Sequence, residues 1–437
     1  MNKIRTRFAP SPTGFLHIGS LRTALYAYVL AKHEGGDFLL RIEDTDQKRE
    51  VPGALDALQT ALKKFGLVWD EFYTQSERLP LYSNAAKKLV ADGHAFYCDC
   101  KPKNAKVEGF SVELRDPCRK KSLVSGAIKL KVPDGKVVFY RDFVHRKEIS
   151  WNTDTVYDAT LLKSDGFPTY HLAAMVDDLD MKISHILRGH DWLPSTPIHL
   201  LVFDYLGRKR PEIGHLTDIL SVETGKKLSK RRDSVFVEQF LGMGYLPEAI
   251  LNFVILLGWA PKDNRELFSL DEFVKHFDVN GFQDANPRFF HDKLNWFNGY
   301  YIRQSQISNL KSQIFKFFGG KYPENEIEKI LPLVQNRINT LKEFEMLAGF
   351  FFERKKVDKK LLGDNYKKHL SKAVETLERG TSLDEVPGKF GFKVGDFFMD
   401  LRIAITGSKF TPPINESIEI LGKEESIERV KKVISDN

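Results

Sequence analysis

Hydrophobic and polar positions near the start of the chain predict a strand, a helix and a second strand in succession. Segment 3–9, KIRTRFA, alternates polar and apolar side chains, which is typical of a β-strand. Segment 20–36 repeats its apolar side chains with a helical period, with Ser20 as the expected N-cap and two glycines at the expected end. Segment 37–46 predicts a second strand that runs into an acidic turn. These elements form a βαβ unit, whose first loop lies where Rossmann-like sheets bind ligands.

Further along the chain the periodicity changes twice. Residues 95–145 alternate irregularly and predict a small insertion with antiparallel strands, whereas residues 155–206 return to an α/β pattern. From about residue 236 helical periods dominate, as in LPEAILNFVILLGWA and ISNLKSQIFKFF. Segment 406–434 predicts a proline-punctuated loop followed by one helix. A chain of 437 residues with such changes is expected to form several domains.

Composition and charge narrow the class of protein. A hydrophobic content of 42% and a charged content of 29% are typical of a globular protein. The net charge of +7 is compatible with a polyanionic partner. The chain has no apolar signal core, no run of about 18 apolar residues, and only 3 cysteines, all between positions 98 and 118. We therefore expect a cytoplasmic protein with no membrane segment and no disulfide framework.

The loop between the first strand and the first helix carries candidate chemistry. Residues 8–20 read FAPSPTGFLHIGS, in which glycines let backbone N–H groups approach an anion at a helix N-terminus. His17 stands at that helix mouth and can donate a hydrogen bond to a phosphate. The alternative interpretation is a tight strand-to-helix turn with a hydrogen-bonded histidine.

A basic segment further along the chain makes a phosphate-binding interpretation of the first segment more specific. Residues 225–231 read GKKLSKR, with Lys227 and Lys230 three positions apart, which suits a polyphosphate. Taken alone, this segment fits a solvated lysine-rich turn equally well. In this order, however, HIGS at 17–20 and KLSKR at 227–231 resemble the "HIGH" and "KMSKS" motifs of class I aminoacyl-tRNA synthetases.

Further segments make the resemblance closer. Arg7 with PSPTGFLHIG, RIEDTD at 41–46, and LLKSDGFPTYHLAAMVDDLDMKISHILRG at 161–189 are similar to bacterial-type glutamyl-tRNA synthetases, as are LRIAITGS and EILGKE near the C-terminus. The resemblance implies an α/β catalytic domain with a Rossmann-like parallel sheet, an inserted α+β domain that binds the tRNA acceptor end, and an all-α C-terminal region that binds the anticodon. The implied boundaries are 1–90 and 171–235 for the two catalytic halves, 91–170 for the insertion, 236–303 for a helical stem-contact domain, and 304–437 for the helical anticodon-binding domain.

The chain departs from the family pattern at four positions. Ser20 replaces the second histidine of the first motif, while Leu228 and Arg231 replace a methionine and a serine of the second motif. These three changes are usual in the family. His190 stands where the family often has an acidic residue, which leaves the substrate or tRNA contact at that point open.

The resemblance assigns both motifs to ATP. Activation is an attack of the amino-acid carboxylate on the α-phosphate, so that the protein mainly positions groups and neutralises charge. His17 and Lys230 are the implied catalytic residues, and Lys227 helps Lys230 to neutralise the β- and γ-phosphates of ATP, which binds with Mg²⁺. The implied ATP-binding residues are Pro10, Ser11, Thr13, Gly14, His17, Gly19, Ser20, Lys227 and Lys230.

Glutamate needs a cation for its side-chain carboxylate and an anion for its α-amino group. By resemblance, Arg7 and Arg188 bind the carboxylate and Glu43 binds the amino group, since a guanidinium fork suits bidentate pairing. Ala9, Ser11 and Tyr170 are implied to line the same pocket. The alternative is that any of these is an ordinary ion pair at a strand end.

A metal site in the insertion stays open. Some family members hold zinc there, and this chain offers Cys98, Cys100 and Cys118 but lacks the usual fourth ligand. Buried or free thiols are the alternative to a Zn²⁺ site. The candidate replacements for the fourth ligand are Asp116, Glu113 and His94.

The implied partners are L-glutamate and tRNA(Glu), with Arg49 and Trp192 as tRNA contacts and a monomer as the expected state. Two enzymatic alternatives remain: a non-discriminating enzyme that also charges tRNA(Gln), and the truncated paralogue that glutamylates queuosine in tRNA. A degenerate protein that only binds RNA is the third alternative, and the intact motifs argue against it.

Overall fold

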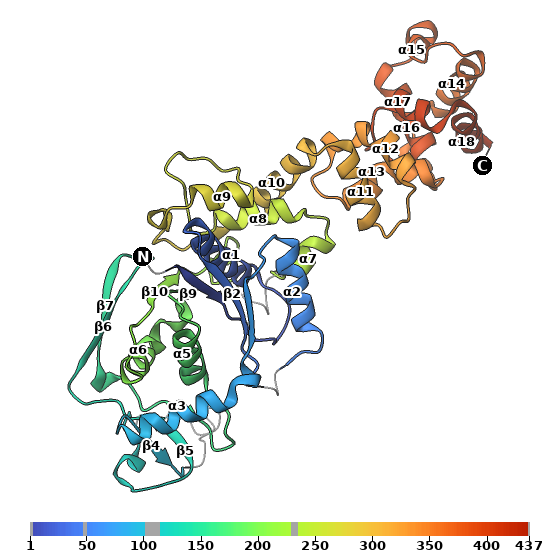
Figure 1. The fold of residues 1–437 in the computed structure, drawn as a ribbon. Helices are drawn as coiled ribbons and strands as arrows, with labels where there is room; N and C mark the ends of the chain where they lie inside the picture. The colour runs from blue at the N-terminus through green and yellow to red at the C-terminus, as the bar shows by residue number, and fades with distance from the viewer. Residues whose placement is uncertain (1–2, 47–49, 101–113, 229–234, 436–437) are drawn as a thin grey trace. The chain divides into compact units, whose positions relative to one another are not determined.

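The computed structural model describes residues 3–46, 50–100, 114–228 and 235–435. It divides into two compact units, one of residues 1–239 and 251–290 and the other of residues 240–250 and 291–437. Each unit is described by itself below, with elements labelled as in Figure 1. None of the helices in the described ranges is both long enough and apolar enough to cross a membrane.

The N-terminal unit is built on two groups of mostly parallel strands. The first group, in spatial order, is β1 (Arg5–Phe8), β2 (Asp37–Ile42) and β3 (Glu71–Thr74), all parallel. The second group is β7 (Lys147–Asn152), β6 (Val137–Asp142), β10 (Glu212–Leu216) and β9 (His185–Gly189). The groups join between β1 and β9, because the N–H of Ser184 donates to the carbonyl of Arg5 over 2.9 Å. The predicted Rossmann-like parallel sheet is therefore present.

Helices cover this sheet and bury its apolar strands. Five of the six residues of β2 are buried, as expected for a parallel strand covered on both faces. Helix α1 packs on β1, β2 and β9, and α5 packs on α6. The helices of this unit are α1 (Ile18–His33), α2 (Ala54–Lys64), α3 (Leu79–Ala91), α5 (Tyr170–Asp180), α6 (Thr196–Tyr205) and α9 (Leu270–His276). Helices α7 (Val237–Gly242) and α8 (Pro247–Ile255) lie where the chain passes between the units.

The start of α1 differs from the sequence prediction, whereas its end agrees. The helix begins at Ile18 and His17 is its N-cap, so the prediction of Ser20 as the cap is wrong. The cause is the His17 ring, whose Nδ1 accepts a hydrogen bond from the N–H of Gly19 over 2.9 Å. After the helix, Gly35 has a left-handed φ of +63°, and a Cβ on Gly36 would lie 2.0 Å from the carbonyl oxygen of Ile4.

The predicted insertion contains a small antiparallel sheet. Its strands are β4 (Ala95–Cys98), β5 (Ala127–Leu130) and β8 (Thr160–Leu162). The β6–β7 hairpin also falls between residues 91 and 170, but β6 pairs in parallel with β10 of the main sheet. The chain thus returns to the main sheet before the insertion ends, and the five-part domain division stays a prediction.

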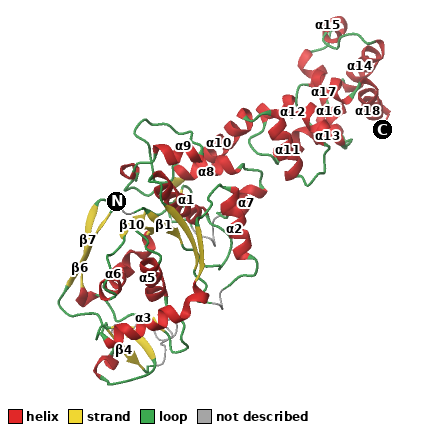
Figure 2. Cartoon of the chain, viewed as in Figure 1, coloured by secondary structure: helices red, strands yellow, loops and turns green. Residues whose placement is uncertain are grey.

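The C-terminal unit, in the residues described, contains helices and connecting loops and no strand (Figure 2). Segment 406–434 forms two helices rather than the single predicted one, because Pro413 is the N-cap of an extra helix whose Ile414 and Ile418 are buried. The helices of this unit are α10 (His291–Gln304), α11 (Ile307–Phe317), α12 (Glu324–Val334), α13 (Glu343–Phe352), α14 (Tyr366–Arg379), α15 (Glu385–Phe390), α16 (Val394–Thr406), α17 (Ile414–Leu421) and α18 (Lys423–Ser435).

Candidate active site

A pocket of about 490 Å³ opens in the N-terminal unit at the carboxyl ends of β1 and β9. This is where parallel α/β sheets bind their ligands. It brings together every described residue that the sequence assigned to ATP or glutamate, and Trp192 as well. Those residues are Arg7, Ala9, Pro10, Ser11, Thr13, Gly14, His17, Gly19, Ser20, Glu43, Tyr170, Arg188 and Lys227. Lys230 and Arg49 lie outside the described residues.

The two sequence motifs approach each other at this pocket. The N–H of Ile18 donates to the carbonyl of Val235 over 3.0 Å, and the N–H of Val237 donates to the carbonyl of Leu16 over 2.9 Å. Before the gap, the N–H of Leu228 donates to the carbonyl of Ile219, and both residues line the pocket. Val235 and Val237 therefore bond the first-motif segment directly, and Leu228 lines the same pocket as that segment.

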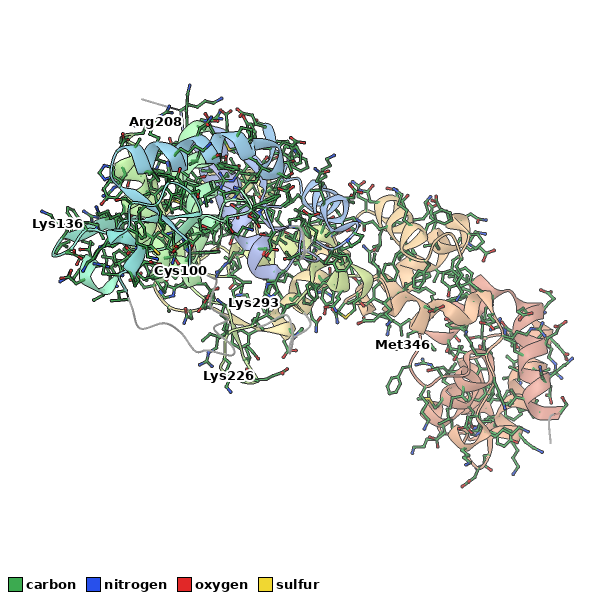
Figure 3. All side chains as sticks on the ribbon, turned by 90° about the horizontal axis from the view of Figure 1, so that it is seen from below. Cys100, Lys136, Arg208, Lys226, Lys293 and Met346 are labelled. Carbon is green, nitrogen blue, oxygen red and sulfur yellow. The ribbon has the colours of Figure 1, made fainter. Side chains whose placement is uncertain are left out.

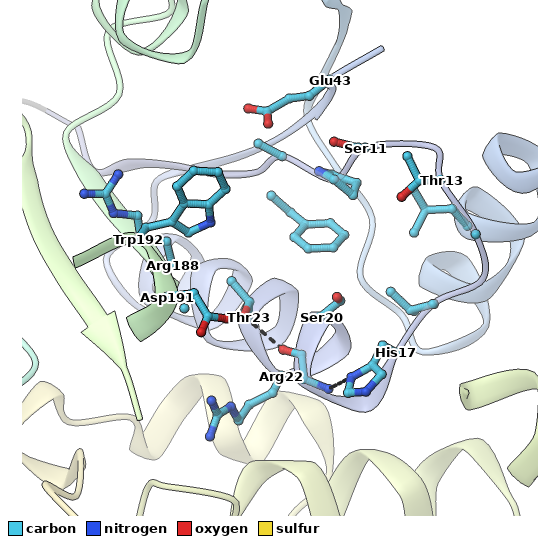
Figure 4. A pocket seen from close by; sticks show the side chains of 18 of the residues that line it. Ser11, Thr13, His17, Ser20, Arg22, Thr23, Glu43, Arg188, Asp191 and Trp192 are labelled. Carbon is cyan, nitrogen blue, oxygen red and sulfur yellow. Dashed lines mark hydrogen bonds between the residues drawn. The ribbon is translucent and has the colours of Figure 1, made fainter. Parts of the chain in front are cut away.

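One side of the pocket mouth carries paired charges. Lys227 forms ion pairs with Asp191 and, over 2.8 Å, with Asp218. Figure 4 shows the N-terminus of α1 at the same pocket, with the bond from the Gly19 N–H to His17. The helix N-terminus favours an anion in the pocket, whereas the charge of Lys227 is compensated by these two aspartates in the structure.

A network of buried charges lies behind the other end of the pocket. Nε of Arg7 donates to Oδ1 of Asp178 over 3.1 Å, and Nη1 of Arg41 donates to the same oxygen over 2.7 Å. Nε of Arg41 lies 3.7 Å from Asp177, and its Nη2 donates to Glu43 over 3.2 Å. All five side chains are at most 10% exposed. Carboxylates therefore compensate the charges of both arginines in this network, which we call the acidic wall.

Glu43 sits where the acidic wall meets the pocket (Figure 4). It follows β2, and its N–H donates to the carbonyl of Pro10 over 3.0 Å, which ties the acidic turn to the first-motif loop. Burial raises the pKa of Glu43 to about 7, against the opposing influence of Arg41 and Arg7. A cation that enters the pocket would favour the ionised form.

A second buried arginine at the pocket, Arg188, has neutral partners. It is the penultimate residue of β9, is 4% exposed, and lines the pocket. Its Nε donates to His215 over 3.0 Å and its Nη1 to His199 over 2.8 Å. Its Nη2 donates to the hydroxyl of Thr196 over 2.7 Å. We call Arg188 with His199, His215 and Thr196 the histidine wall.

An aromatic pair closes one side of the pocket. The rings of Tyr170, at the start of α5, and Trp192 are stacked with centroids 4.0 Å apart and an angle of 27° between their planes. Tyr170 also interacts electrostatically with Arg188. Trp192, predicted to contact tRNA, is 37% exposed and also lines this pocket. Such a pair offers an apolar face to a ligand while leaving one edge in solvent.

Several lining residues escaped the sequence analysis. Asp191 and Thr217 to Ile219 follow the carboxyl ends of β9 and β10, a position that would have pointed to them had the strand order been known. His190 is exposed and is not among the lining residues. His199 and His215 are fully buried behind Arg188 and carried no sequence signal.

The three cysteines gather with an aspartate in the insertion. Potential ligand atoms of Cys98, Cys100, Asp116 and Cys118 all lie within 4.8 Å of one another. Cys100 is exposed (Figure 3), while Cys98 and Cys118 are buried. His94, another candidate ligand, instead stacks on Tyr205, and Glu113 lies outside the described residues. Asp116 is therefore the fourth group of this cluster among the residues described.

Comparisons with known proteins agree along the whole chain. A family model described as the catalytic domain of class I tRNA synthetases (E and Q) matches residues 3–125 and 119–296, and an anticodon-binding domain model matches residues 308–434. A glutamate–tRNA ligase of Dehalococcoides mccartyi is 37% identical over 99% of this chain and 98% of its own. One of Finegoldia magna is 36% identical over 100% of both chains. The crystal structure of a glutamate tRNA ligase from Elizabethkingia meningosepticum, in complex with its amino acid, superposes with a TM-score of 0.86 at 33% identity over 99% of both chains.

Proposed function

The chain belongs to the glutamate–tRNA ligases of the class I aminoacyl-tRNA synthetases, and on that premise we propose that it attaches L-glutamate to the 3′ end of tRNA(Glu) through a glutamyl-adenylate formed from ATP. The observation that carries the proposal is one pocket that contains the N-terminus of a helix and also a buried arginine, Arg188, whose partners in the described part of the chain are two histidines and a threonine. The full-length match with its anticodon-binding region argues against the truncated queuosine-modifying paralogue.

Activation brings two anions together, so the residues of the pocket act by position and charge. We assign the ATP phosphates to the mouth of α1, where His17 and Gly19 face the pocket. Lys230, with Lys227, is assigned to the charge that develops on the departing pyrophosphate. Mg²⁺ bound with ATP would share in neutralising the phosphates.

Glutamate is assigned to the space between the two walls. Its side-chain carboxylate would lie against Arg188 and Arg7, and its α-ammonium against Glu43. Glutamine would leave the guanidinium of Arg188 without an anion, which disfavours it by several kcal/mol in a buried site. Ala9, Ser11 and Tyr170 would shape the remaining surface.

The activity is tested by ATP–pyrophosphate exchange with and without tRNA. Glutamate-dependent exchange that requires tRNA(Glu) is the expected result, because family resemblance implies that tRNA binds before activation. Exchange that depends on no amino acid would contradict the proposal. Charging of tRNA(Gln) alongside tRNA(Glu) would identify a non-discriminating enzyme, which is the second outcome to be measured.

We also propose that the cysteine cluster holds Zn²⁺, with Asp116 in place of the usual fourth ligand. Three thiolates and one carboxylate are a donor set that zinc accepts. One oxygen of Asp116 accepts from the N–H of Cys118 over 2.8 Å, and the other is paired with Lys129. A metal would therefore compete with that ammonium, and Lys129 would move aside.

The zinc proposal is tested by elemental analysis of the purified chain and of Asp116→Ala. One zinc per chain in the unmodified protein, with a large loss in the variant, is expected. An Asp116→Cys variant, which restores a soft fourth ligand, serves as the matched control. A metal content near zero in the unmodified protein would leave three structural thiols instead.

A further inference from the structure

The hydrogen bonds of Arg188 determine which ring nitrogen of His199 and of His215 carries a proton. A guanidinium only donates, so Nδ1 of His199 and Nε2 of His215 must both be unprotonated acceptors. His199 then carries its proton on Nε2, which lies 3.0 Å from Nδ1 of His171. His215 carries its proton on Nδ1, which lies 2.8 Å from Asp142. Both rings are therefore neutral while they hold Arg188.

Other groups around the histidine wall keep those rings neutral. Burial lowers the pKa of His215 and of His171 to about 4, and burial together with Arg188 holds the pKa of His199 well below its ordinary value. The ionisable neighbours of these rings are Arg188, Arg7, Asp142 and His190, and the nearby phenols are Tyr140 and Tyr170. The carboxylate of Asp142 stays on the far side of the His215 ring, where Tyr140 and the N–H groups of Val144 and His145 also bond it.

The charge of Arg188 is thus left uncompensated within the wall. Among the residues that the structure describes, no carboxylate lies within 4.0 Å of its guanidinium nitrogens, whereas Arg7 and Arg41 share Asp178. A buried cation held only by neutral acceptors keeps its full attraction for an anion that arrives from the pocket. The orientation of the guanidinium is nevertheless fixed, because three of its nitrogens are engaged from behind.

We propose that His199 and His215 are positioning residues that determine specificity for a side-chain carboxylate, because they orient Arg188 as neutral acceptors and leave its charge for the amino acid. This inference rests on the proposed function, in which Arg188 binds the carboxylate of glutamate. An acidic side chain at either position would bind Arg188 equally well and would remove that selectivity.

The test compares isosteric variants at His199 in tRNA-dependent exchange with glutamate and with glutamine. His199→Asn keeps a neutral oxygen near the Nδ1 position, whereas His199→Asp places a carboxylate oxygen there. We expect His199→Asn to keep the KM for glutamate within about 3-fold of the unmodified enzyme, and His199→Asp to raise it about 10-fold or more, since an internal ion pair then competes with the substrate. The KM for ATP should be unchanged in both variants.

Two further measurements, amino-acid selectivity and thermal stability, distinguish the paired variants. The ratio of kcat/KM for glutamate to that for glutamine should fall about 10-fold in His199→Asp and stay near its original value in His199→Asn. The thermal midpoint should be higher in His199→Asp than in His199→Asn, because the buried guanidinium gains a partner. A purely structural role would affect both variants alike. His215→Gln and His215→Glu repeat the comparison should the His199 variants fail to fold.

The outcomes separate the inference from the function on which it rests. Equal glutamate KM values and equal selectivity in the paired variants would overturn the role of the histidines. An unmodified enzyme without glutamate-dependent exchange would instead overturn the proposed function. Normal exchange in the unmodified enzyme, together with unchanged glutamate KM in an Arg188→Met variant, would remove Arg188 from the carboxylate site and the inference with it.

Discussion

The two walls of the pocket bury arginines in opposite ways. In the acidic wall, Arg7 and Arg41 share Asp178, and Arg41 also lies near Asp177 and Glu43. In the histidine wall, Arg188 is held by two neutral rings and a hydroxyl. Both walls hold their guanidinium groups by hydrogen bonds, but only the first places carboxylates against them. The acidic wall is therefore expected to contribute to stability, and the histidine wall to substrate binding at a cost in stability.

The largest effect is expected from breaking the acidic wall. Asp178→Asn leaves two buried guanidiniums short of an anion, because Asp178 is 0% exposed and bonds both Arg7 and Arg41. We expect the free energy of unfolding to fall by about 3–5 kcal/mol, measured by urea denaturation. Asp180→Asn, at a carboxylate 50% exposed, is the matched control and should change it by under about 1 kcal/mol. Equal losses in the two variants would remove the distinction between the walls.

Removing the charge of the histidine wall is expected to reduce catalytic efficiency with glutamate without reducing stability. Arg188→Met removes the group proposed to bind the glutamate carboxylate and should lower kcat/KM for glutamate by about 10²- to 10³-fold in the exchange assay. Its thermal midpoint should be unchanged or higher, because the variant no longer buries an uncompensated cation. A strong drop in the thermal midpoint would show that Arg188 stabilises the fold and would contradict the comparison.

A substitution of a residue assigned to ATP leaves both walls intact and therefore tests the nucleotide assignment separately from the glutamate assignment. Lys230→Ala should reduce the rate of activation by about 10²-fold, the scale expected for losing a preorganised charge partner. The KM for glutamate should stay near its original value, in contrast to Arg188→Met. Exchange at the original rate would refute the role of Lys230, and Lys226→Ala, at an exposed lysine (Figure 3), is the control.

The smallest effect is expected in the pH dependence of kcat/KM, through Glu43 of the acidic wall. Burial raises the pKa of Glu43 to about 7, so that lowering the pH through 7 protonates it and removes the anion proposed to bind the α-ammonium of glutamate. We expect kcat/KM for glutamate to fall about 10-fold for each pH unit below 7 and to level off above it. In Glu43→Gln the profile should be flat between pH 6 and 8, at a lower value. A flat profile in the unmodified enzyme would exclude Glu43 from amino-group binding.

Local elements followed from the sequence because their causes are local. The alternation in 3–9 and the period in 20–36 produced β1 and α1. Two local predictions were wrong. His17 rather than Ser20 caps α1, because its ring accepts a hydrogen bond from a backbone N–H. A short helix, α17, precedes the last helix and begins directly after Pro413 in a segment that was predicted to be a loop. The resemblance of both motifs to those of class I synthetases predicted that they converge, and the described residues Lys227 and Leu228 line the same pocket as the first motif.

By itself the sequence determined the strand–loop–helix unit, the two motifs and the residue types that glutamate and ATP require. The tertiary structure alone decided which group each arginine meets. Arg7 finds Asp178 at 171 positions along the chain, while Arg188 finds His199 and His215 at 11 and 27 positions. Nothing local distinguishes these two arginines, since each lies near the end of a buried strand. Whether a buried charge is compensated depends on which distant elements the fold packs against it, and in this pocket that choice pairs Arg7 with a carboxylate and leaves Arg188 held by neutral groups.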